Sequence, residues 1–295
     1  MLDVVIIGSG PAGITAAIYA KRANLNVAVV EKEYLGTGQI AESSRVDNYP
    51  GIPGIDGEKF REHAESLGVE FTEAQVLSLG QKDGIWIIGC DEDITLESKA
   101  VIYATGCKNR PLGVPGEEKY YGRGLSFCAV CDGAFYKGKR VAVIGGGDTA
   151  LDDAMYLSDI CEKVYLVHRR EFFRGSASTL EKLKQKENVE IIVNARVEEI
   201  TGDKKIDGII LDNKTKLNIS GLFAAVGMIP QTELLKEFGV LDESNYVKAS
   251  EDTKTTVNGL FAAGDVRTKQ LRQVVTAAAD GANAIYSVME YLRNI

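Results

Sequence analysis

Residues 3–13 read DVVIIGSGPAG, and this segment decides the fold. It predicts a buried strand over residues 3–7, a tight turn and an alanine-rich helix that ends near residue 23. A second strand, residues 27–30, ends at Glu31, which is 18 residues after Gly13. Strand, glycine-rich turn, helix and acidic residue at this spacing form the fingerprint of a Rossmann-like dinucleotide-binding unit. The alternative, a glycine-rich turn without a ligand, is disfavoured by the complete fingerprint.

The glycines of this turn have distinct expected roles. Gly8 and Gly10 allow the tight turn and the close approach of a pyrophosphate, which would rest on the helix N-terminus. Gly13 is the third glycine of the fingerprint. Glu31 would accept hydrogen bonds from the hydroxyl groups of a ribose.

The same pattern occurs a second time. It has a strand over residues 141–144, a helix to about residue 160 and a strand over residues 164–167. The glycine turn between the first strand and the helix carries Gly145, Gly147 and Ala150. The chain therefore contains two dinucleotide-binding units.

The two units differ at the end of their second strands. A shift of 137 residues, from Gly8 to Gly145, places His168 where the first unit has Glu31. Three arginines follow it: Arg169, Arg170 and Arg174. A carboxylate at this position suits a free ribose 2′-hydroxyl, whereas arginines suit a 2′-phosphate. We therefore expect NADP(H) in the second unit and an ADP moiety without that phosphate in the first, although a solvated basic face is the alternative.

Three further segments predict how the chain runs through its domains. Residues 101–106, 222–227 and 260–265 are short apolar runs that end in small residues, as strands do where they approach a ligand. Ala104 lies at the end of the first. Their order predicts an α/β fold with a discontinuous first domain, residues 1–111 and 245–295, and an inserted second domain, residues 112–244. The outgoing linker is marked by prolines and glycines, namely Pro111, Gly113, Pro115 and Gly116.

Two such units in one chain usually hold a hydride donor and a flavin. The expected class is thus a two-dinucleotide-binding flavoprotein with an FAD domain and an NADPH domain.

A Cys128-Ala-Val-Cys131 pair precedes the second unit. A zinc site needs more ligands at suitable spacing, and the other cysteines are scattered singly. Two ordinary buried cysteines are the second alternative. A redox-active pair is favoured because two intervening residues allow a reducible disulfide and a thiolate of lowered pKa. Asp132 is a candidate proton donor or acceptor, or simply the turn residue of Asp-Gly.

Composition restricts the function further. The chain has 295 residues, 45% of them hydrophobic, and a formal net charge of −8, which argues against a nucleic-acid or anionic-membrane surface. The chain has five cysteines, an odd and small number for its length, which argues against a secreted disulfide framework. Residues 4–20 are apolar, yet no basic segment precedes them and glycines interrupt them, so we expect a cytoplasmic protein and not a signal peptide. Two histidines leave little for a metal site, and none is expected.

These features together resemble the low-molecular-weight thioredoxin reductases over nearly the whole chain. The motifs that carry the resemblance are GSGPAG (8–13), GQ (38–39), NYPG (48–51), ATG (104–106), CAVCDG (128–133), GGGDTA (145–150), HRREFFR (168–174), AAGD (262–265) and RQ (272–273).

The resemblance implies an enzyme that passes electrons from NADPH through FAD and the Cys128–Cys131 disulfide to thioredoxin. It implies a homodimer, with Cys131 as the sulfur nearest the flavin, and a rotation of the second domain between the half-reactions. FAD would contact Gly38, Gln39, Asn48, Asp265, Arg272 and Gln273. NADPH would be held by Gly145, Gly147, Ala150, His168, Arg169, Arg170 and Arg174.

Two departures from the family pattern concern specificity. Asp148 stands beside the expected pyrophosphate, where its charge would cost some affinity, although a helix start favours a carboxylate. The segment after the cysteines, residues 133–136, has one aromatic residue fewer than close relatives where they meet thioredoxin. Related reductases that use ferredoxin would lack either the cysteine pair or the second glycine turn, and a redox sensor that does not turn over is the alternative from another class.

Overall fold

The structure, a computed structural model, describes residues 1–33, 37–42, 46, 48–52 and 54–295. The chain divides into two compact units, one formed by residues 1–108 and 229–295 and the other by residues 109–228. The first unit is therefore discontinuous and the second is inserted into it. Each has its own sheet and its own core.

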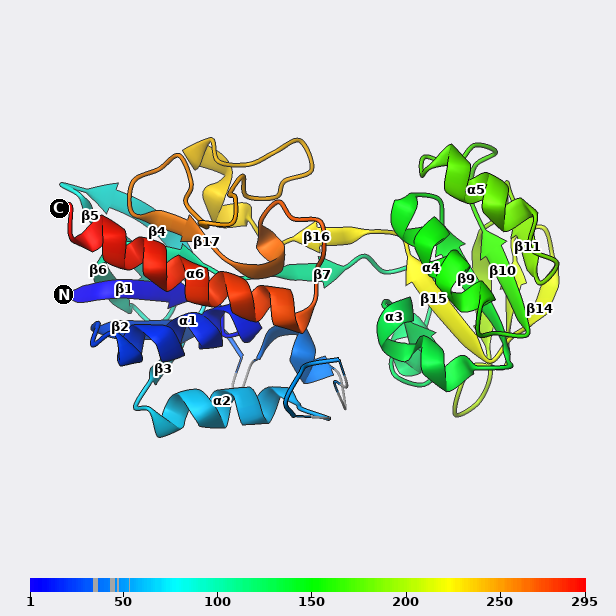
Figure 1. The fold of residues 1–295 in the computed structure, drawn as a ribbon, viewed down its shortest axis with the longest axis horizontal. Helices are drawn as coiled ribbons and strands as arrows, with labels where there is room; N and C mark the ends of the chain where they lie inside the picture. The colour runs from blue at the N-terminus through cyan, green and yellow to red at the C-terminus, as the bar shows by residue number, and fades with distance from the viewer. Residues whose placement is uncertain (34–36, 43–45, 47, 53) are drawn as a thin grey trace. The chain divides into compact units, whose positions relative to one another are not determined.

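The first unit is built on a seven-stranded sheet, with the order β3-β2-β1-β6-β5-β4 and β17 added against β6 (Figure 1). The strands are β1 (Leu2–Ile7), β2 (Val27–Glu31), β3 (Glu70–Glu73), β4 (Val76–Lys82), β5 (Ile85–Cys90), β6 (Thr95–Tyr103) and β17 (Leu260–Ala262). Strands β1, β2, β3, β6 and β17 are parallel, whereas β4, β5 and β6 form an antiparallel meander. The helical segments are α1 (Pro11–Arg22), η1 (Gly38–Glu42), α2 (Gly57–Ser66), η4 (Glu233–Phe238), η5 (Gly264–Val266) and α6 (Val274–Leu292).

Alternating apolar residues of the parallel strands bury both faces of this sheet. Val4 and Ile6 pack with α1, α2 and α6 on one face, whereas Val5 and Ile7 pack with the meander and η4 on the other. Helix α6 lies directly along α1, because Gly281 has no Cβ: an added Cβ would stand 2.2 Å from the carbonyl oxygen of Ala12. The glycine turn after β1 is thereby fixed at the carboxyl end of the sheet.

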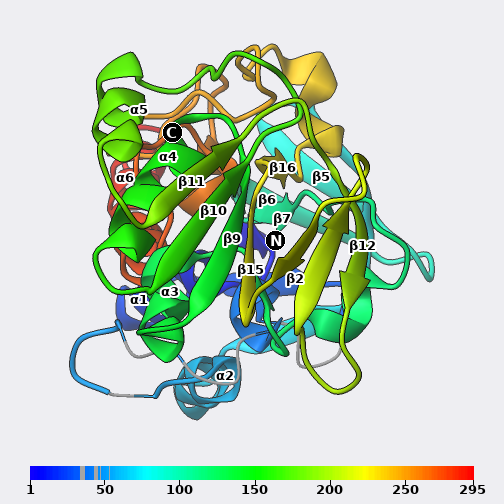
Figure 2. The ribbon, with the colours of Figure 1, turned by 90° about the vertical axis from the view of Figure 1, so that its right-hand side faces the viewer.

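The second unit has a five-stranded parallel sheet of order β11-β10-β9-β15-β8 (Figure 2). Its strands are β8 (Leu125–Ser126), β9 (Arg140–Gly145), β10 (Lys163–Val167), β11 (Val189–Ile192) and β15 (Gly221–Ala225). Its helical segments are η2 (Glu117–Tyr120), α3 (Ala129–Asp132), η3 (Gly133–Tyr136), α4 (Asp148–Ser158) and α5 (Ala177–Lys184). A separate antiparallel sheet consists of β12 (Val197–Thr201), β13 (Gly208–Leu211) and β14 (Lys216–Asn218).

Alternation again decides the layers of the second unit. Val141 and Val143 of β9 face α4 and α5, whereas Ala142 and Ile144 face the side covered by the three-stranded sheet. The segments predicted as strands and helices on either side of both glycine turns are therefore confirmed to within two residues.

The two crossings between the units lie side by side. Strand β7 (Cys107–Asn109) pairs with β16 (Met228–Pro230) in a two-stranded ribbon. The outgoing crossing falls close to the expected residue 111, but the chain returns at residue 229 and not near 245. The reason is packing: Leu235, Val240 and Val247 are buried in the core of the first unit, so the segment before residue 245 belongs to it.

Candidate active site

The first glycine turn closes tightly on the end of β6. A Cβ on Gly8, whose φ is +100°, would lie 2.6 Å from the carbonyl oxygen of Ala104. A Cβ on Gly13 would lie 1.9 Å from the carbonyl oxygen of Gly8. At Gly10, by contrast, nothing lies nearer than 3.8 Å to an added Cβ. Gly10 is thus the least crowded of the three glycines, with Thr37 and Gly38 at van der Waals distance from an added Cβ, and a ligand backbone would approach the turn there.

The carboxylate of Glu31 already accepts hydrogen bonds from neighbouring residues of the protein. Its Oε2 accepts hydrogen bonds from the backbone N and the Oγ of Ser9, at 2.9 and 2.8 Å. Its Oε1 accepts from the backbone N of Lys32 and of Glu33, at 2.8 and 3.3 Å. Four donors match the four lone-pair sites of a carboxylate. Glu31 therefore ties the glycine turn to the end of β2, and a ribose bond would have to replace the long bond from Glu33.

The residues expected around the flavin meet in a second cluster of the first unit. Gln39 donates from Nε2 to the carbonyl oxygen of Cys107, and Asn48 donates from Nδ2 to Oε1 of Gln273 at 2.8 Å. Gly38 has φ +66°, and a Cβ there would lie 3.2 Å from Cα of Gly10. The GQ segment is thus placed against both the glycine turn and the strand after β6.

Asp265 is the electrostatic centre of this cluster. Its carboxyl is mostly buried, which raises its pKa to about 6, against the opposing influence of nearby Lys269 and Arg272. Its Oδ1 is buried without a hydrogen-bond partner among the described residues. Arg272 donates from Nε to the carbonyl oxygen of Asp265 at 3.3 Å, and its guanidinium lies 4.2 Å from the ring centroid of Tyr246. A buried acceptor without a donor fits a ligand that brings a hydroxyl or N–H group.

Asp280 holds this region together, and the sequence analysis missed it. It is 4% exposed and accepts from Nε and Nη2 of Arg267, at 2.8 and 2.6 Å, and from Nζ of Lys269 at 2.9 Å. It also accepts from the backbone N of Gly264 at 2.9 Å. A buried carboxylate with two cations fixes the turn that carries Asp265. The only hint in the sequence was an acidic residue within an apolar helical segment.

The cysteine pair of the second unit forms a disulfide. Cys128 and Cys131 are joined, with their Cα atoms 5.3 Å apart, at the start of α3. Cys128 is half-buried and Cys131 is exposed. The backbone N of Cys131 donates to Sγ of Cys128 at 3.1 Å, a contact that would stabilise a thiolate on Cys128 once the disulfide is reduced.

Asp132 is held beside the disulfide by a serine that the sequence analysis did not single out. Ser126 donates from Oγ to Oδ2 of Asp132 at 2.6 Å. The same Oγ accepts from the backbone N of Cys128 at 3.1 Å. Ser126 therefore bridges the carboxylate of Asp132 and the backbone of Cys128. The only indication of this role in the sequence is that Ser126 stands two residues before Cys128.

The second glycine turn is likewise uncrowded at its second glycine. A Cβ on Gly145 would lie 2.3 Å from the carbonyl oxygen of Ala225 and 2.7 Å from Cβ of Ala150, whereas nothing lies within 4 Å at Gly147. Helices α1 and α4 both begin without a side-chain cap, while α2 and α5 are capped by Asp56 and Ser176. Uncapped N–H groups beside an uncrowded glycine fit a pyrophosphate in both units.

The basic segment after β10 separates into two parts. Arg169, Arg170 and Arg174 are exposed, and no described carboxylate forms an ion pair with any of them. His168 is 6% exposed, its ring lies 4.9 Å from that of Phe173, and a Cβ on Gly146 would stand 2.2 Å from its Cε1. Burial lowers the pKa of His168, which keeps it neutral. The arginines have no carboxylate partner that would compete with a phosphate. His168 packs against the glycine turn, and its Nε2 is buried without a hydrogen-bond partner among the described residues.

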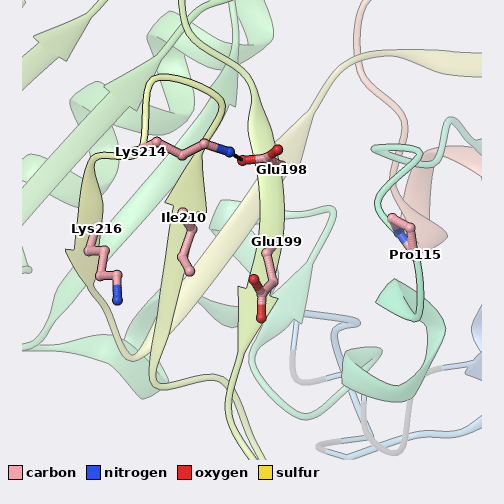
Figure 3. A pocket seen from close by; sticks show the side chains of 6 residues that line it. All are labelled: Pro115, Glu198, Glu199, Ile210, Lys214 and Lys216. Atoms are coloured by element: carbon pink, nitrogen blue, oxygen red, sulfur yellow. Dashed lines mark hydrogen bonds and ion pairs between the residues drawn. The ribbon is translucent and has the colours of Figure 1, made fainter.

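Other features of the described residues carry no comparable chemistry. A hollow beside the three-stranded sheet is lined by residues that include Glu198, Glu199 and Lys216, and Lys214 is already paired with Glu198 (Figure 3). Cys90, Cys107 and Cys161 are buried, and burial raises the pKa of each thiol, so they act as packing residues. Among the described residues, no three His, Cys, Asp or Glu side chains lie together as metal ligands do. None of the helices there is long and apolar enough to cross a bilayer.

Comparison with known proteins gives consistent results. Residues 2–281 match the family model described as pyridine nucleotide-disulphide oxidoreductase. A thioredoxin reductase of Helicobacter pylori is 40% identical over 310 residues, covering 100% of both chains. The crystal structure of thioredoxin reductase from Streptococcus pyogenes superposes with a TM-score of 0.93 at 39% identity, covering 100% of this chain and 99% of the other. A Lactococcus lactis thioredoxin reductase, described as the FR conformation, gives a TM-score of 0.69 at 36% identity and covers 100% of both chains.

Proposed function

The chain belongs to the pyridine nucleotide-disulphide oxidoreductase family and, within it, to the low-molecular-weight thioredoxin reductases, and on that premise we propose that it is an NADPH-dependent thioredoxin-disulfide reductase. The observation that carries the proposal is the Cys128–Cys131 disulfide, which lies in the same unit as the arginine-flanked glycine turn. That unit combines a dithiol with a site of NADP type.

The cofactors divide between the units. FAD would lie on the Gly10 side of the first glycine turn, with the unpartnered Oδ1 of Asp265 and the side chains of Gln39, Asn48, Arg272 and Gln273 nearby. NADPH would lie on the turn between Gly145 and Ala150, with its 2′-phosphate toward Arg169, Arg170 and Arg174. NADPH supplies a hydride, and FAD converts it into an electron pair that a disulfide can accept.

The residues of the chain then carry out thiol chemistry. Two electrons and two protons convert the Cys128–Cys131 bond into two thiols, one proton coming from solvent. Asp132, oriented by Ser126, is placed to accept a proton from a thiol when a thiolate is needed and to return it to a leaving thiolate. The thiolate attacks the disulfide of thioredoxin, a mixed disulfide forms, and the second cysteine resolves it, so that the protein disulfide is restored and thioredoxin leaves as a dithiol.

A rotation of the second unit between the two half-reactions is part of the proposal. Both crossings between the units lie in the β7–β16 ribbon, which is a short hinge for such a motion. The named FR conformation of the Lactococcus lactis relative supports a family with more than one arrangement. A homodimer and a cytoplasmic location complete the proposal, and sedimentation of the purified protein tests the first of these.

Anaerobic titration tests the reaction directly. The purified protein should be yellow and release FAD, excess NADPH should bleach its flavin absorbance, and oxidised thioredoxin should restore that absorbance. A colourless protein that FAD cannot reconstitute would contradict the whole assignment. A flavin that NADPH bleaches but no thioredoxin reoxidises would indicate another disulfide acceptor.

A further inference from the structure

The basic segment after β10 is attached to the second glycine turn by three consecutive backbone N–H groups. The carbonyl oxygen of Gly146 accepts from the N of Arg174 at 2.7 Å and from the N of Gly175 at 3.2 Å. The N of Ser176 donates to Oδ1 of Asp148 at 2.7 Å. The backbone on the C-terminal side of Arg174 is thus held by two acceptors, one from the turn and one from the first residue of α4.

The segment after β10 approaches the start of α4 so closely that only glycine fits at residue 175. A Cβ on Gly175 would lie 2.8 Å from the N of Asp148 and 2.7 Å from Cδ1 of Leu151. Ser176 is also the N-cap of α5, where its Oγ accepts from the N of Thr179. Asp148 therefore joins the beginnings of α4 and α5 at the point where the arginine segment ends.

Among the described residues, Asp148 forms no other side-chain hydrogen bond or ion pair that would explain a carboxylate there. It is exposed, and it stands at the helix start where the pyrophosphate is expected, so its charge alone would oppose a phosphate. Its hydrogen bond to Ser176 supplies a reason for an acceptor at this position. This hydrogen bond requires a side-chain oxygen at the position of Oδ1, and it does not require a negative charge.

We propose that Asp148 is a positioning residue for recognition of the 2′-phosphate: it fixes Ser176 and, through it, the backbone of Arg174, so that the guanidinium is presented to the phosphate in advance. The inference rests on the proposed NADPH site and names a determinant of its specificity. Without the anchor, ordering of the segment must accompany ligand binding, and that cost falls on ligands that carry the phosphate.

The loss of one such hydrogen bond corresponds to about fivefold in affinity. The probe is adenosine 2′,5′-bisphosphate, measured by calorimetry on the FAD-loaded protein. Asp148→Ala should bind it about fivefold more weakly, whereas Asp148→Asn, which keeps the oxygen acceptor, should bind it as tightly as the unaltered protein or more tightly. Asp152→Ala, which removes an exposed carboxylate one turn later on α4, is the matched control and should not weaken binding.

Hydrogen exchange gives a second readout that does not depend on activity. The amide of Ser176 should exchange faster in Asp148→Ala and at the normal rate in Asp148→Asn. Unweakened binding by Asp148→Ala, or an equal loss in the alanine and asparagine variants, overturns the role of Asp148. Failure of the unaltered protein to bind the bisphosphate overturns the NADPH assignment itself, and the positioning role with it.

Discussion

The two glycine turns share the spacing of their first two glycines but differ in the way they are tied to the strand beside them. In the first unit, Ser9 of the turn donates twice to Glu31 at the end of β2. In the second unit the corresponding positions are Gly146 and His168, which touch through van der Waals contact. Hydrogen bonds link this turn instead to the segment after β10. They are accepted by the carbonyl oxygen of Gly146 and by Asp148, which corresponds to Pro11.

The difference shows what has to change when a site gains a phosphate. A carboxylate at the strand end would repel the 2′-phosphate, and it also holds the turn in place, so it cannot simply be removed. The second unit has a buried histidine at the equivalent position, and its turn is anchored to the segment after β10 through Gly146 and Asp148. In the proposed NADPH site, recognition of the phosphate would be left to the exposed arginines.

Thiol chemistry separates the two units most sharply, so the largest effect is expected at the cysteine pair. Cys131→Ser should lower thioredoxin reduction by about 10³-fold or more, because neither the disulfide nor its dithiol can form. Bleaching of the flavin by NADPH should persist, since the hydride is accepted before the disulfide takes part. Stopped-flow absorbance and a thioredoxin turnover assay measure the two steps.

The matched control for this prediction is Cys161→Ser in the same unit. Burial raises the pKa of the Cys161 thiol to about 11, so it stays protonated and cannot replace the pair. Thioredoxin turnover should be unchanged in that variant. Appreciable turnover by Cys131→Ser would remove the pair from the pathway.

The arginine segment comes second in expected size. Replacing both Arg169 and Arg170 by alanine should lower kcat/KM for NADPH by about 10²-fold, because each charge-assisted bond contributes roughly 1.5–3 kcal/mol. NADH should be almost unaffected, since it lacks the phosphate. Steady-state kinetics with both coenzymes decide the matter: an equal loss with NADPH and NADH would give these residues a structural role only.

Two equivalent positions on the first helix of each unit provide a test by pH. Asp153 of α4 corresponds to Ala16, which is fully buried on α1. Burial, with some repulsion from Asp152, raises the pKa of Asp153 to about 7. The folded protein therefore binds this proton more tightly than the unfolded chain does, and stability falls as pH rises from about 4 to 7 and is level above that.

Asp153→Asn removes this penalty. Its stabilisation of the protein against urea should be near zero at pH 4 and reach roughly 2 kcal/mol at pH 8, about half of the full linkage value because the carboxyl keeps some contact with water. The unfolding midpoint followed by circular dichroism measures the gain. A gain of the same size at both pH values would show that the charge of Asp153 is not the cause.

The link between Ser9 and Glu31 should give the smallest effect. Glu31→Gln keeps the shape of the side chain but turns a donor toward backbone N–H groups, so one or two hydrogen bonds are lost. FAD affinity should fall by about tenfold, measured by reconstitution of the flavin-free protein. Glu33→Gln, an exposed neighbour, is the control. If both variants retained FAD equally well, the hydrogen bonds between Ser9 and Glu31 would not be what holds the first glycine turn in its FAD-binding conformation.

Much of the site followed from the sequence because its determinants are local. A glycine-rich turn between a strand and a helix, a CxxC pair and a cluster of arginines at a strand end are each recognisable within a few residues, and both glycine turns were located in this way. The same holds for the strands and helices around them, whose apolar alternation sets the buried faces.

Other features depended on partners far apart in the chain. No local pattern shows that Asp280 would meet Arg267 and Lys269 around Gly264, that Ser126 would hold Asp132, or that residues 229–245 would return to the first core. His168 stood in the register of a ligand and lies beneath a glycine, and Asp148 appeared to oppose the coenzyme and is bonded to Ser176. Sequence determined which chemistry this chain carries, because turns and reactive groups are properties of short segments. Tertiary structure alone decided which charges are buried and which residues hold the reactive groups in place, because burial and long-range hydrogen bonds exist only once distant segments have packed together.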